Sequence, residues 1–131
     1  GGERRRDPVL QRAHRKGWRF WRGVAKLVIR QFDVFDNPSP AGRSKAPFVV
    51  VLQDDLFNDG PVIVVGPLFD QRLLKPTPRL NPVFEIGGKV VVLSIREIAS
   101  IPRSGLRSHV TNLDTHRDRF IAAIDLLFTG I

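Results

Sequence analysis

The sequence of residues 48–65 is FVVVLQDDLFNDGPVIVV, and this stretch carries the clearest structural signal in the chain. Phe48–Leu52 is a continuous apolar run, which is typical of a strand buried on both faces or at a subunit contact. Asn58-Asp59-Gly60 has the composition of a turn, and Val62–Val65 is a second run of β-type residues. We therefore expect two successive β-strands here.

Further β-type segments lie on both sides of this stretch. Gln31–Asp36 alternates polar and apolar residues, as a half-buried strand does. The three prolines within Lys75–Pro82 indicate an irregular crossing. After them, Val83–Ile86 and Lys89–Ile95 are joined by Gly87-Gly88, which is the pattern of a β-hairpin.

The last third of the chain changes character. Pro102–Gly105 is expected to end the β region, and Thr115 with Asp118 resembles a capping box at the start of a helix. Gly130 then has the position of a helix stop, so the pattern predicts a helix over about residues 116–128. That helix would be about 20 Å long. Its apolar stripe consists of Phe120, Ala123, Ile124, Leu127 and Phe128, widened by Ile121. We therefore predict a mainly β fold with one C-terminal helix, in which about five antiparallel strands form a small barrel or curled sheet.

The charge of the chain is unevenly distributed. The 131 residues carry a net charge of +8, and residues 1–30 hold all of it, with ten Lys or Arg residues and two acids. Residues 31–131 hold eleven bases and eleven acids and are neutral. We expect residues 1–28 to be a basic extension that is either a solvated tail or an amphipathic helix beginning at Asp7-Pro8. Such a helix would suit DNA phosphates, an anionic membrane or an acidic partner.

Several kinds of chemistry find no support in the sequence. The chain has no Cys, which excludes disulfides, thiolate zinc sites and Cys nucleophiles. None of the three histidines, His14, His109 and His116, has a ligand companion three or four residues away. Asp54-Asp55 is expected to point its two carboxylates in opposite directions, and the apolar runs are too short to span a membrane. We therefore predict a binding protein rather than an enzyme, with no metal and no cofactor.

The order of several short motifs from about Ile29 onwards resembles the CcdB-type toxins of toxin–antitoxin modules. The motifs are Gln31-Phe32 with Val34, Leu52-Gln53-Asp54-Asp55, Gly66-Pro67-Leu68, Arg72-Leu73-Leu74, Pro82-Val83-Phe84-Glu85-Ile86-Gly87, Ala99-Ser100-Ile101-Pro102 and the ending Ala123–Ile131. The resemblance covers residues 29–131 and makes that range the toxin domain, with residues 1–28 outside it.

The resemblance implies a specific fold and a specific set of partners. It implies a cytoplasmic homodimer with an SH3-like barrel and a long C-terminal helix, which binds the DNA gyrase A subunit and traps gyrase on cleaved DNA. It also implies neutralisation by a CcdA-type antitoxin, with which the toxin represses its own operon, so that DNA is met only through that complex and no membrane is involved. The family's gyrase-binding residues are normally Trp-Gly-Ile, and the corresponding residues here are Thr129, Gly130 and Ile131.

Two alternatives remain open at this stage. Thr129 replaces the family Trp, which favours a paralogue that binds the antitoxin without poisoning gyrase. An endoribonuclease on the same barrel is the other alternative, although residues 31–131 lack the net positive charge that an RNA groove needs.

Overall fold

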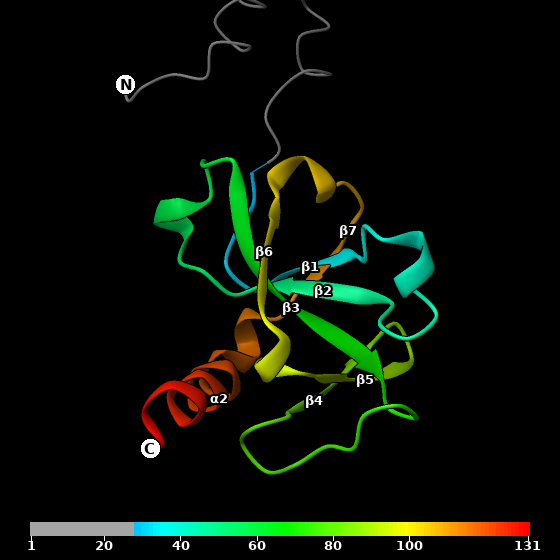
Figure 1. Cartoon of the computed structure of the whole chain (residues 1–131), viewed down its shortest axis with the longest axis vertical. Helices are drawn as coiled ribbons and strands as arrows, with labels where there is room; N and C mark the ends of the chain where they lie inside the picture. The colour runs from blue at the N-terminus through cyan, green and yellow to red at the C-terminus, as the bar shows by residue number, and fades with distance from the viewer. Residues whose placement is uncertain (1–27) are drawn as a thin grey trace, which may run out of the picture.

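A computed structural model describes residues 28–131, so the helix expected at Asp7-Pro8, His14 and both tryptophans lie outside the described residues. Within these residues, one strongly curled antiparallel sheet dominates, and a single α-helix packs beneath it (Figure 1). The strands and helix are β1 (Asp33–Asp36), β2 (Phe48–Val51), β3 (Val62–Asp70), β4 (Val83–Ile86), β5 (Lys89–Leu93), β6 (Ala99–Pro102), β7 (His109–Asn112) and α2 (Arg117–Thr129). The prediction of a mainly β fold with one C-terminal helix is confirmed.

The sheet contains seven strands, two more than expected, in the order β4-β5-β3-β2-β1-β7 with β6 also paired to β3. The expectation that Pro102–Gly105 ends the β region is wrong. Arg103–Gly105 forms only a short 3-10 turn, after which β7 pairs antiparallel with β1. This pairing joins the first and last strands of the described residues.

β3 is longer than the predicted Val62–Val65 because Gly66-Pro67 does not end it. Its first half pairs with β6 and its second half with β5, while β2 runs along its other edge. The Ser94 amide donates to the Pro67 carbonyl at 3.1 Å, at the point where one partner strand gives way to the other. A proline is tolerated there because the missing N–H would have no ladder partner.

The predicted hairpin is confirmed. β4 and β5 pair from Val83–Val92 to Ile86–Lys89, so that only Gly87 and Gly88 connect them. Their φ angles of 57° and 81° lie in the left-handed region that a two-residue hairpin turn of this hand requires.

Two hydrophobic cores lie on opposite faces of the sheet, and β2 contributes to both. Val50 and Leu52 point into the larger core, towards α2, whereas Val49 and Val51 point into the smaller one. The smaller core also contains Ile29, which is only 4% exposed, together with Phe35, Ile63, Val65 and Leu106. Of the two alternatives given for Phe48–Leu52, burial on both faces or a subunit contact, the first holds for Val49–Leu52, and both faces are covered within one protomer.

The start of the helix differs from the prediction. His116 occupies the N-cap position and no side chain caps the helix, so the capping box of Thr115 and Asp118 is wrong. A 3-10 turn over Asp114–His116 precedes the helix, and the Asn112 side-chain oxygen accepts the Asp114 amide at 2.7 Å. The chain thus enters the helix through a tightened turn instead of a side-chain cap.

Candidate functional site

Helix α2 is fixed to the sheet by a stack of three aromatic rings. Phe120 is fully buried and lies between Phe32, at 4.6 Å between ring centroids, and Phe84, at 4.8 Å. Both pairs are nearly parallel, and the Arg119 guanidinium covers the Phe84 ring at 4.5 Å. This packing holds the N-terminal half of α2 in place, so the position of its C-terminal end is set by a rigid element.

The three predicted site residues lie together, all exposed, at the C-terminal end of α2. The Thr129 hydroxyl donates to the Asp125 carbonyl at 2.7 Å, within the helix. Gly130 is the C-cap with φ 75°, and its amide donates to the Leu126 carbonyl at 3.0 Å, which confirms the predicted helix stop. Ile131 is 79% exposed and Phe128 is 65% exposed, so the helix end carries uncovered apolar surface.

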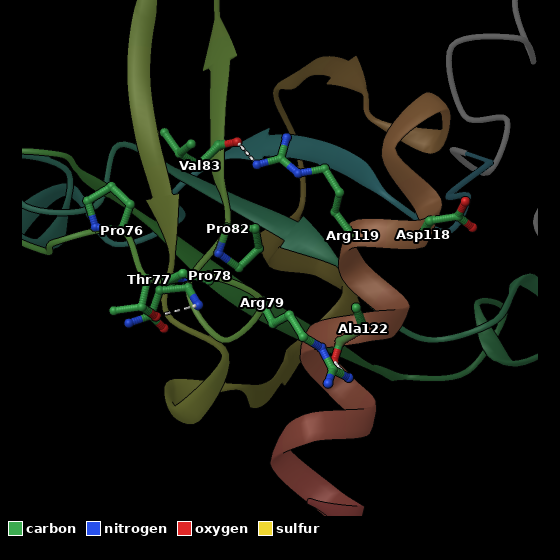
Figure 2. A pocket seen from close by; sticks show the side chains of 10 residues that line it. Pro76, Thr77, Pro78, Arg79, Pro82, Val83, Asp118, Arg119 and Ala122 are labelled. Carbon is green, nitrogen blue, oxygen red and sulfur yellow. Dashed lines mark hydrogen bonds between the residues drawn. The ribbon is translucent and has the colours of Figure 1, made fainter. Parts of the chain in front are cut away.

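A groove of about 520 Å³ lies beside this helix, between α2 and the proline-rich segment 76–83 (Figure 2). Pro76, Pro78 and Pro82 line one wall, and Ala122 lies on the opposite wall. Arg79 crosses the groove, and its guanidinium donates to the backbone oxygens of Ala122, at 3.1 Å, and Ile131. Arg79 could not be predicted as a contact residue from the sequence, because nothing in its local pattern indicates a partner 52 residues away.

Other large apolar side chains are also exposed, mostly on loops. Leu56 is 83% exposed and Phe57 is 65% exposed in the turn after β2. By contrast, most apolar side chains of β2, β3 and β5 are buried within the protomer. These strands therefore expose little apolar area that a second protomer could cover, and self-association has to use the side chains that are exposed. Within the described residues, these are Val28, Leu56, Phe57, Val62, Leu73, Val110, Phe128 and Ile131.

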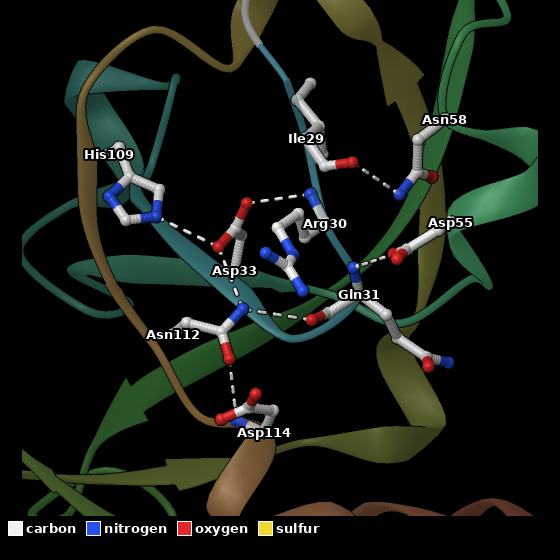
Figure 3. Close-up of polar contacts among 9 residues, drawn as sticks. All are labelled: Ile29, Arg30, Gln31, Asp33, Asp55, Asn58, His109, Asn112 and Asp114. Carbon is white, nitrogen blue, oxygen red and sulfur yellow. Dashed lines mark hydrogen bonds and ion pairs between the residues drawn. The ribbon is translucent and has the colours of Figure 1, made fainter.

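A cluster of polar contacts surrounds Asp33 on β1 (Figure 3). The expectation that Gln31–Asp36 is a half-buried strand is wrong at this residue, since Asp33 is 4% exposed. One carboxylate oxygen of Asp33 contacts His109 Nε2 and Asn112 Nδ2, each at 2.9 Å. The other oxygen accepts the Arg30 amide at 2.8 Å. A buried carboxylate is tolerated because three partners satisfy it, and the contacts tie β7 and the segment before β1 to the sheet.

Asp54, Asp55 and His116, which the sequence also offered as candidate residues, each contact different groups. Asp54 accepts the Leu56 amide and Asp55 accepts the Gln31 amide, so the two carboxylates have different partners. His116 is exposed, with its ring 5.6 Å from Phe84. Within residues 28–131, no three His, Asp or Glu side chains gather closely enough to hold a metal ion.

Asp70 and Arg72 form an ion pair at the end of β3, with a guanidinium–carboxylate distance of 2.8 Å. Hydrogen bonds and charge from Arg72 lower the pKa of Asp70 to about 2.

No helix in the described part of the chain is both long and apolar enough to cross a membrane.

A sequence model of the family described as CcdB protein matches residues 31–130. This range runs from the turn before β1 to the C-cap of α2, so the match covers every strand and the helix found within residues 28–131. A search of curated proteins finds no match.

Proposed function

We propose, given that this chain belongs to the CcdB family and is the toxin of a toxin–antitoxin system, that it poisons DNA gyrase by binding its A subunit. The binding residues in this proposal are Thr129, Gly130 and Ile131, and the toxin acts in the cytoplasm without catalysing a reaction itself. Trapping the gyrase–DNA cleavage complex is the toxic event.

The observation that supports this proposal most strongly is the uncovered end of α2. Phe128 in the last turn of α2 and Ile131 just beyond it are largely exposed, and the other end of this helix is fixed by the Phe120 stack. An apolar side chain held on a rigid element loses little conformational entropy on binding. If Ile131 becomes fully buried against gyrase, it contributes roughly 1.5–3 kcal/mol of binding free energy.

The remaining partners follow from the family. We propose that the toxin is a homodimer, that a CcdA-type antitoxin neutralises it, and that the complex represses its own operon. In this proposal the toxin meets DNA only through the antitoxin, in keeping with the zero net charge of residues 31–131. Sedimentation at micromolar concentration tests the dimer, and a monomer there would contradict it.

Thr129 is the position at which this chain departs from the family's Trp-Gly-Ile ending. A Trp side chain buries far more area than Thr, and Trp is enriched among interface hot spots. The Thr129 hydroxyl is bonded within the helix, so it offers little to a partner. We therefore expect Thr129→Trp to bind gyrase A at least ~10-fold more tightly, which corresponds to about 1.4 kcal/mol.

The deciding experiment measures binding of the full chain, Thr129→Trp and a chain lacking residues 130–131 to the gyrase A dimerisation region. The proposal expects the order Thr129→Trp, full chain, truncated chain, from tightest to weakest. Equal binding by the truncated chain would refute the site. If neither the full chain nor Thr129→Trp binds, the non-poisoning paralogue is supported, and cleavage of RNA by the full chain would support the endoribonuclease instead.

A further inference from the structure

Arg79 has an unusual backbone for a residue with a side chain. Its φ is 70°, in the left-handed region, and only Phe32 shares this feature among the described non-glycine residues. Such a conformation is unfavourable for a residue with a Cβ and persists only where the surrounding structure holds it. The contacts of the Arg79 side chain are therefore of interest, because they help to hold this conformation in place.

The guanidinium of Arg79 connects its loop both to α2 and to the residue beyond the end of that helix. It donates to the Ala122 carbonyl within α2 (Figure 2). It also donates to the backbone oxygen of Ile131, beyond the helix end. The left-handed conformation of Gly130 turns Ile131 out of the helical path, which places the Ile131 backbone oxygen within reach of Arg79. A planar guanidinium has five donors in a fixed fork and suits two acceptors at once.

The bond from Arg79 fixes the backbone of Ile131 and leaves its side chain free. The Ile131 residue is still 79% exposed, so Arg79 does not hide it. We infer that Arg79 is a positioning residue, which holds Ile131 in place so that its side chain meets gyrase already ordered. This inference rests on the proposed role of Gly130 and Ile131.

The loop that carries Arg79 has other attachments to the rest of the protein. Arg119 donates to the Val83 carbonyl, Thr77 and Asn81 form an isolated bridge, and Leu80 packs against the larger core. Removing the Arg79 guanidinium should therefore leave the loop and the fold in place. It should release Ile131, and ordering a released residue upon binding weakens the affinity.

The test compares Arg79→Ala with Arg119→Ala in the full chain. Arg119→Ala is the matched control, because it removes another Arg-to-carbonyl bond across the same groove without touching Ile131. We expect Arg79→Ala to bind the gyrase A dimerisation region about 10-fold more weakly, with its melting temperature unchanged within a few degrees. Arg79→Lys should restore only part of the affinity, since a single ammonium group does not reproduce the fork.

A second measurement tests, without gyrase, whether Arg79 orders Ile131. The heteronuclear NOE of the Ile131 amide in the free protein should fall in Arg79→Ala and stay unchanged in Arg119→Ala. An unchanged NOE in Arg79→Ala, or full affinity in Arg79→Lys, would overturn the inference. If the NOE falls but the unaltered chain does not bind gyrase, Arg79 orders Ile131 as inferred and the proposed gyrase target is wrong.

Discussion

Phe120→Ala should separate α2 from the sheet more effectively than any change at the helix surface. The Phe120 ring is fully buried, with one aromatic ring stacked on each side at 4.6 and 4.8 Å. Removing such a ring loses its transfer free energy and leaves a cavity that Phe32 and Phe84 fill only in part. The expected loss is about 3–5 kcal/mol in the free energy of unfolding. For a domain of this size, that loss lowers the melting temperature by roughly 14–23 °C.

The control for this prediction lies on the same helix. Phe128→Ala removes the same side chain, but Phe128 is 65% exposed, so its replacement should change the free energy of unfolding by no more than about 0.5 kcal/mol. Both variants are unfolded in urea at one protein concentration, so that any self-association affects them equally. A loss below about 1 kcal/mol in Phe120→Ala, or an equal loss in Phe128→Ala, would refute the claim that the aromatic stack anchors the helix.

Three further predictions concern the sheet, the surface and the N-terminal segment. Gly66→Ala should cost about 1–3 kcal/mol in thermal unfolding, because the new Cβ would lie 2.7 Å from Leu93 Cδ1; an unchanged melting temperature would mean that Leu93 moves freely. Arg72 lowers the pKa of Asp70 from 3.8 to about 2, so the stability from this pair is present above pH 4 and is lost as the pH falls towards 2. Asp70→Asn should therefore flatten the pH dependence of the unfolding free energy in that window, and an unaltered slope would argue against the pair. A chain that begins at Val28 should melt within a few degrees of the full chain, whereas one that begins at Arg30 loses the buried Ile29 and about 1.5–3 kcal/mol; equal melting temperatures for the two would contradict the burial of Ile29.

The elements that the sequence predicted well depend on local signals. The β4–β5 hairpin follows from Gly87-Gly88 between two apolar runs, since the turn and its register are set by neighbouring residues. The end of α2 follows from Gly130 in the same way. The predicted location of Thr129, Gly130 and Ile131 at an exposed helix end depends on these local signals as well.

The elements that the sequence analysis missed depend on distant partners. β7 contains the polar residues His109, Thr111 and Asn112, and it is a strand because β1, some 75 residues earlier in the chain, pairs with it and Asp33 binds two of its side chains. The alternation rule failed at Asp33 because it treats a carboxylate as exposed, whereas three hydrogen bonds allow it to be buried. Arg79 was missed because its left-handed backbone and its contact with Ile131 arise only in the folded chain.

The most direct test of the proposed function is gyrase-mediated cleavage of supercoiled DNA, read as linear product after the enzyme is denatured. The full chain and a chain lacking residues 130–131 are compared at matched concentrations, after equal melting temperatures show that both are folded. The proposal predicts that the full chain accumulates cleaved DNA and that the truncated chain does not. Cleaved DNA at equal levels with both chains would contradict the assignment of Gly130 and Ile131 to the gyrase-binding site.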